Sequence, residues 1–107
     1  MGTMLKMLKQ YEVRIEVHRA AAKYHGALAE YASALHLDTQ SQRRKEMADK
    51  CISAAGEYRV RLLDLLDYAF TTGLSEVGEQ EIQRTRKYLE LLDVEMGYIR
   101  KMSGADK

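Results

Sequence analysis

The chain has no proline in its 107 residues, although an average protein of this length contains about five. Proline interrupts helices because it has no amide hydrogen and its ring clashes with the preceding turn. Alanine, leucine, glutamate, lysine and arginine are abundant here, and these residues favour helix. Together these features predict long, uninterrupted helices.

Three stretches of the chain carry apolar or small side chains three and four residues apart, which places them on one face of a helix. This spacing predicts helices over about 3–36, 40–71 and 75–102. Residues 11–18 alternate between apolar and polar side chains, as a strand would. A lone strand would leave its backbone groups without partners, so we predict helix there as well.

The first predicted helix carries two neighbouring stripes of apolar and small residues, which together cover roughly half of its circumference. One stripe consists of Met4, Leu8, Tyr11, Ile15, His18, Ala22, His25, Ala29 and Ala32. The other consists of Val13, Val17, Ala20, Tyr24, Ala27, Tyr31 and Ala34.

Turn and capping residues separate the predicted helices. Gly73 can close the second helix, because glycine accepts the left-handed backbone of a helix C-terminus, and Ser75 can cap the third. The connecting turns are short, so neighbouring helices run antiparallel. We therefore predict one all-α domain over residues 1–107, an antiparallel up-down-up bundle of three long helices. A break in the first helix near Gly26 would make four.

The apolar surface of these helices is wider than one neighbouring helix can cover. A generously buried three-helix core would account for it, and so would self-association that completes a four-helix or larger bundle. The chain also has seven tyrosines, which suit an interface because the ring can be buried while the hydroxyl reaches water or a partner. The predicted interaction face consists of Tyr24, Tyr31, Leu66, Leu91 and Tyr98.

Arg14 lies within the apolar arc of the first helix and therefore needs an acidic partner. If the first turn pairs residues near His36 with residues near Gln42, antiparallel register places Arg14 level with Asp64 and close to Asp67. We predict a structural ion pair between Arg14 and one of these aspartates.

Cations gather at one end of the predicted bundle. The topology brings the start of the second helix and the end of the third together, and with them Arg43, Arg44, Lys45, Arg100 and Lys101. Such a cluster can bind phosphate groups through charge-assisted hydrogen bonds. Nearby acidic residues dilute it and no aromatic residue is interleaved for base stacking, so a solvated end is the simpler interpretation.

His18 and His25 are seven residues apart on one stripe, and the antiparallel register places Cys51 near the level of His25. A zinc site needs three or four ligands, and the chain lacks the usual Cys-x-x-Cys, His-Glu-x-x-His and Glu-x-x-His spacings. We predict no metal and no cofactor. The chain also lacks phosphate-loop and nucleophile motifs, and a cysteine on an apolar stripe stays unreactive, so we predict that it is not an enzyme.

The single cysteine excludes an internal disulfide and favours a reducing compartment, so we predict a cytoplasmic protein. No segment approaches the roughly 20 apolar residues that cross a bilayer, and the N-terminus does not resemble a signal peptide. The formal net charge of +1 gives no general attraction to nucleic acid or to anionic membranes.

These features predict a non-enzymatic protein-interaction module, such as an adaptor, a chaperone-like protein or an assembly accessory protein. We expect it to self-associate through helix faces and to bind another protein. The first alternative is an accessory protein that contacts nucleic acid or phosphate through the basic end. The second is a bundle that binds a small ligand or a metal around His18 and His25.

Overall fold

The computed structural model describes residues 2–37, 41–72 and 78–103, with side chains for 8–35, 42–71 and 78–102. These residues form helices α1 (Gly2–Leu37), α2 (Ser41–Thr72) and α4 (Glu79–Ser103). The described residues include no strand, and α1 continues through Gly26 without a break. The predicted all-α fold is confirmed, and the alternative with a broken first helix is not found. The predicted turn residues Gly73 and Ser75 lie outside the described residues.

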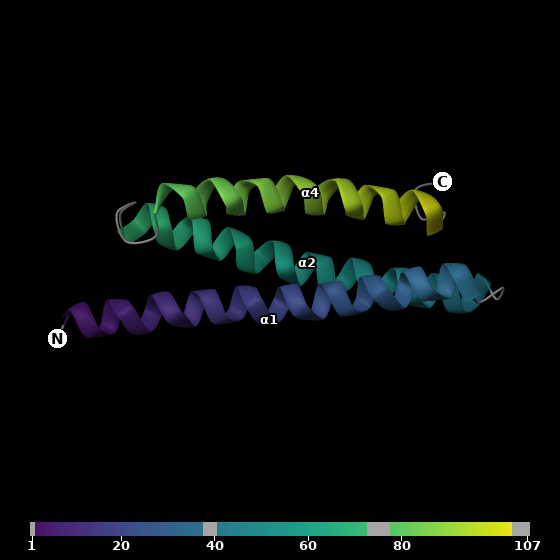
Figure 1. The fold of residues 1–107 in the computed structure, drawn as a ribbon, viewed down its shortest axis with the longest axis horizontal. Helices are drawn as coiled ribbons and strands as arrows, with labels where there is room; N and C mark the ends of the chain where they lie inside the picture. Colours follow the sequence, from purple (N-terminus) through teal and green to yellow (C-terminus); the bar gives the residue numbers. More distant parts are fainter. Residues whose placement is uncertain (1, 38–40, 73–77, 104–107) are drawn as a thin grey trace.

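The three helices form an elongated up-down-up bundle of 57 × 21 × 18 Å (Figure 1). Helix α2 runs antiparallel to both α1 and α4 and lies between them in this view. The N-terminal end of α1 extends beyond the start of α4. Among the described helices, none combines the length and the apolar character needed to cross a bilayer.

Helix α1 packs on α2 through the second of its two stripes. Tyr24 and Tyr31 are almost fully buried, with 1% and 3% of their surface exposed, and alanines of the same stripe are buried beside them. Helix α2 contributes mostly small side chains to this core: Ala48, Cys51, Ala54 and Ala55. Small residues on both surfaces let the two helices approach closely, and the tyrosine rings fill the space around them.

The first stripe of α1 faces solvent. Leu8, Tyr11 and Ile15 are 59%, 57% and 47% exposed. Farther along the helix the same face presents exposed histidines and alanines. We refer to this surface as the outer face of α1; its residues are Leu8, Tyr11, Ile15, His18, Ala22, His25 and Ala29. It contains no aspartate, glutamate, lysine or arginine, which is unusual for a solvent-exposed helix face.

Helix α4 packs on α2 through larger side chains. Leu92, Met96 and Ile99 belong to the same core as Leu62 of α2. Thr85 of α4 is also buried, and its hydroxyl donates to the backbone carbonyl of Glu81, one turn earlier, at 2.8 Å. This bond satisfies the hydroxyl, so the buried threonine carries no unpaired polar group.

The start of α4 is fixed by glycine and by a small second core. Gly78 has φ of 90°, a backbone conformation that other residues rarely adopt. Its carbonyl accepts the first hydrogen bond of the helix from the Ile82 amide at 3.2 Å. Ile82 in turn packs against Tyr68 and Ala69 near the end of α2. Gly78 therefore adopts the backbone conformation from which α4 begins.

Replacing Leu62 with alanine removes a side chain that is 1% exposed at the junction of the three helices. We expect Leu62→Ala to lower the free energy of unfolding by about 2 to 5 kcal/mol, because it leaves a cavity in a packed core. Val60→Ala is the matched control, since Val60 is 52% exposed on the same helix and should cost less than about 0.5 kcal/mol. Urea denaturation followed by circular dichroism measures both, and equal losses would contradict this core.

Candidate interaction groove

Helices α1 and α4 flank a groove whose floor is α2. Helix α2 packs along both of them, whereas α1 and α4 make few direct contacts with each other. Three hollows of about 210, 390 and 290 Å³ lie between α1 and α4. The first two share His18 and Tyr88 among their lining residues, and the last two share Glu95. The hollows therefore lie one after another along the two helices, and we call them together the α1–α4 groove.

Two polar links join the walls of the groove. The Arg14 guanidinium donates to both carboxylate oxygens of Glu81, at 3.1 Å from Nε and 2.6 Å from Nη2. Farther along, the Tyr24 hydroxyl donates to the carboxylate of Glu95. The hydrogen bonds from Arg14 raise its pKa, and burial together with the bond to Glu95 raises the pKa of Tyr24. Long side chains therefore connect α1 to α4 where apolar packing does not.

The rim of the groove is apolar and exposed. On α4 it consists of Tyr88, Leu91, Tyr98 and Met102, and Leu35 belongs to it on α1. Tyr98 is 67% exposed and Leu91 49%. Single exposed apolar residues are normal on soluble proteins, whereas larger exposed apolar patches are typical of interaction surfaces, so this rim is a candidate for one. The outer face of α1 adjoins this rim through His18 and His25, which line the groove.

The structure divides the five residues of the predicted interaction face between the surface and the interior. Leu91 and Tyr98 are exposed on the rim, as an interaction face requires. Tyr24 and Tyr31 are core residues, so assigning them to a surface is wrong. Leu66 is half-buried against the Tyr68 cluster and lies outside the groove lining. Tyr24 and Tyr31 are buried because they lie on the α1 stripe that packs against the alanines of α2.

Arg14 does form an ion pair between helices, but the predicted partner is wrong. Its partner is Glu81 on α4, and Asp64 is instead contacted by Arg61 at 3.4 Å. Arg14 lines the groove, whereas Asp64 and Asp67 line a hollow between α1 and α2. A position along a helix does not specify the direction in which a side chain leaves it, so the level of Arg14 along the bundle does not identify its partner.

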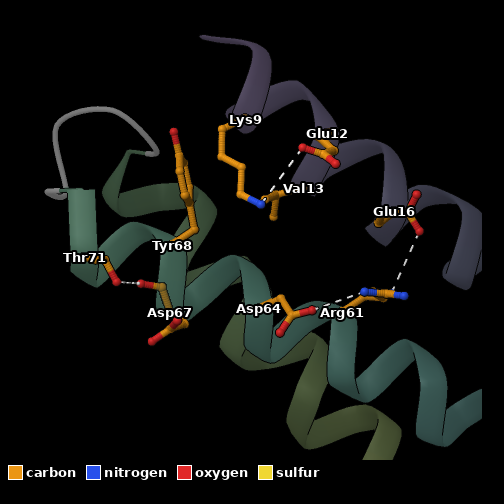
Figure 2. Close-up of a pocket in the computed structure, with 9 residues that line it drawn as sticks. All are labelled: Lys9, Glu12, Val13, Glu16, Arg61, Asp64, Asp67, Tyr68 and Thr71. Carbon is orange, nitrogen blue, oxygen red and sulfur yellow. Dashed lines mark hydrogen bonds and ion pairs between the residues drawn. The ribbon is translucent and has the colours of Figure 1, made fainter. Parts of the chain in front are cut away.

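The hollow between α1 and α2, of about 570 Å³, is larger than each of the three hollows of the groove. It is lined mostly by charged side chains. Figure 2 shows Lys9, Glu12 and Glu16 of α1 facing Arg61 and Asp64 of α2. Lys9 pairs with Glu12 at 4.0 Å and Arg61 with Glu16 at 3.9 Å. These pairs are exposed and contribute little stability. The arrangement is a solvated charged surface in which most charges already have a partner.

The histidines do not form a site with the cysteine. His18 and His25 are exposed and line the middle hollow, where the ring of His25 lies 5.5 Å from that of Tyr24 and 6.4 Å from that of Tyr58. Cys51 is fully buried below, and burial raises the pKa of its thiol. Within the described ranges, no three His, Cys, Asp or Glu side chains are grouped so as to hold a metal ion.

The predicted basic residues lie at one end of the bundle, where α2 begins and α4 ends (Figure 1). Arg43, Lys45, Arg100 and Lys101 are exposed. Arg44 is half-buried, and its Nε atom is enclosed without a hydrogen-bond partner among the described residues. Successive residues of a helix point in directions about 100° apart. The three consecutive cations of α2 therefore do not share one face.

Comparisons of the chain with protein-family models, curated proteins and solved structures find no match.

Alkaline pH should destabilise this core. Burial raises the pKa of Cys51, Tyr24, Tyr31 and Tyr58, whose ordinary values are 9.0 for the thiol and 10.0 for the phenols. Above about pH 9 the unfolded chain loses these protons while the folded chain keeps them, so stability falls as pH rises. We expect the urea midpoint to decrease from pH 8 to pH 10.5. Cys51→Ala should remove the part of the decrease that begins near pH 9, and a constant midpoint in the parent chain would contradict the burial of these groups.

Proposed function

We propose that this chain is a non-enzymatic protein-interaction module that self-associates, with α1 of a second copy lying over the α1–α4 groove. The observation that carries the proposal is the open groove itself. Its walls are joined by two polar links and its rim is a row of exposed apolar side chains. A fourth helix in this position would cover that rim and complete a four-helix arrangement.

A second copy suits this groove because α1 carries a surface that matches it. The outer face of α1 has no charged residue, so two copies can meet there without like-charge repulsion. Its N-terminal half presents the large side chains of Leu8, Tyr11 and Ile15, and its C-terminal half presents the small ones of Ala22 and Ala29. In an antiparallel pair, the large half of each copy meets the small half of the other.

The available area is sufficient for a stable dimer. Residues 8–35 of α1 span about 40 Å at 1.5 Å per residue. A surface two helices wide is about 20 Å across, so each copy can contribute up to about 800 Å². This equals the area that each partner contributes to a typical specific interface.

Salt dependence distinguishes this proposal from binding of nucleic acid at the basic end. Association through apolar rims should depend weakly on salt, whereas binding of phosphates by Arg43 and Arg44 should weaken steeply as salt increases. We place the module in the cytoplasm, because a single buried thiol suits a reducing compartment.

Light scattering at two concentrations and two salt levels tests the proposal. We expect the parent chain to be a dimer that dissociates on dilution. Leu91→Lys should convert it to a monomer, because it places a cation on the apolar rim. Val60→Lys is the matched control, since Val60 is similarly exposed on α2 away from the groove lining, and this variant should remain a dimer.

A parent chain that is monomeric at every concentration would overturn self-association through the groove. Equal effects of the two lysine variants would show that copies meet elsewhere. Circular dichroism of each variant confirms that the helices are intact before the masses are compared.

A further inference from the structure

The α4 wall of the α1–α4 groove contains a half-buried carboxylate, that of Glu95, which lines both the hollow of about 390 Å³ and the hollow of about 290 Å³. This carboxylate accepts the Tyr24 hydroxyl, and no cation among the described residues forms an ion pair with it. A second copy that covered Glu95 with apolar atoms alone would remove its water and leave its charge unpaired, which is unfavourable. A cation of the second copy at this position would offset that cost.

Arg84 is a cation on the same wall of the groove. It is exposed, it lines the hollow of about 210 Å³, and it forms no ion pair with another described residue. Arg84 and Glu95 are eleven residues apart, which is about three turns of helix, so both side chains leave α4 on nearly the same side. The groove edge of α4 therefore carries opposite charges about 16.5 Å apart, and neither charge is paired with another described residue.

An antiparallel two-fold dimer brings these charges together when the grooves of the two copies face each other. The two-fold axis then crosses the helices at right angles, so α1 of the second copy lies along α1 and its α4 lies along α4. The groove edges of the two α4 helices lie on the same side of the α4 pair, so they meet. When Arg84 of one copy is level with Glu95 of the other, the axis passes α4 between Leu89 and Glu90.

Hydrogen bonds across the groove show which level of α1 corresponds to this point on α4. Arg14 of α1 is bonded to Glu81 of α4, and Tyr24 of α1 to Glu95 of α4. The point between Leu89 and Glu90 lies slightly more than halfway from Glu81 to Glu95. The axis therefore passes α1 slightly more than halfway from Arg14 to Tyr24, close to residue 20.

The outer face of α1 gives an independent check of this register. Antiparallel pairing about Ala20 places Tyr11 level with Ala29 of the other copy. It also places His18 level with Ala22. Large side chains of one copy thus meet small side chains of the other, as the proposed interface requires. The charges of α4 and the side-chain sizes of α1 therefore give the same position for the axis.

The same register brings apolar side chains together beside the charges. Leu91 of each copy lies level with Tyr88 of the other, and these side chains are 49% and 44% exposed in the single chain. Covering them excludes water from the centre of the interface. The hydrogen bonds of a charge pair at its edge are then stronger than those of an exposed pair.

We infer that the dimer is antiparallel and two-fold symmetric, with its grooves face to face and Arg84 of each copy paired with Glu95 of the other. This inference rests on the proposed self-association and specifies its register. Symmetry makes the pair occur twice in each dimer. The planar guanidinium can donate two parallel hydrogen bonds to the carboxylate while the Tyr24 hydroxyl keeps its own bond.

Charge reversal tests the pairing, with the dissociation constant of the dimer measured by analytical ultracentrifugation. Arg84→Glu and Glu95→Arg should each raise the dissociation constant about tenfold or more, because each places like charges together twice. The double variant should dimerise at least about fivefold more tightly than Glu95→Arg alone, because it restores opposite charges. Glu95→Arg is the reference for this recovery, since both variants lose the acceptor of the Tyr24 hydroxyl.

Arg86 supplies the matched control. It is exposed on the same helix, but its guanidinium lies over the Phe70 ring of α2, 5.6 Å from the ring centroid, and it is outside the groove lining. Arg86→Glu should therefore change the dissociation constant by less than about twofold. Combined with Glu95→Arg, it should give no recovery.

The outcomes separate the pairing from the proposed function. A parent dimer that Arg84→Glu does not weaken would overturn the pairing and leave self-association intact, whereas a parent that is monomeric at every concentration would overturn both. A double variant that dimerises no more tightly than Glu95→Arg, with its helices intact by circular dichroism, would also overturn the pairing. A parallel dimer would give this last result, because each charge would then lie level with its own counterpart.

Discussion

The close packing of α1 on α2 through alanines is the constraint on which the rest of the structure depends. Ala20 and Ala27 of α1 and Ala48 and Ala55 of α2 are buried with at most 4% of their surface exposed. Side chains this small let the helices approach closely and leave the tyrosines beside them as the main volume of the core. Helix α4 packs on α2 with leucine, methionine and isoleucine, and it therefore lies on a separate face of α2. The α1–α4 groove is the space between α1 and α4, which both pack on α2.

Two polar links across the groove connect α4 to α1, although α4 is held mainly by its packing on α2. The two hydrogen bonds of Arg14 and Glu81 are half-shielded from water, which strengthens them relative to exposed pairs. Glu95 accepts the Tyr24 hydroxyl from the opposite wall. These hydrogen bonds form at the ends of long side chains. They therefore join α1 to α4 without filling the groove between them. The apolar rim therefore stays in solvent unless a further helix covers it.

Periodicity predicts most of the fold and less of the candidate site. The three helices follow from apolar spacing and from the absence of proline, and the described residues confirm them. The two stripes of α1 look equally apolar in sequence. Which of them is buried depends on packing against the alanines of α2, which are remote in the chain. The pairing of Arg14 with Glu81 was missed for the same reason, since it requires the relative rotation of α1 and α4. The groove and the position of Glu95 depend on the same rotation.

The proposed self-association uses the surface that the core of the single chain leaves uncovered. Hydroxyl-radical footprinting tests most directly whether a second copy covers the α1–α4 groove, because the reactivity of each side chain follows its exposure. Tyr98 on the rim and Phe70 on α2 are 67% and 58% exposed in the single chain. We expect oxidation of Tyr98 to fall as the concentration increases from monomer to dimer while oxidation of Phe70 stays constant. Unchanged oxidation of Tyr98 in a dimer of confirmed mass would contradict the proposed interface.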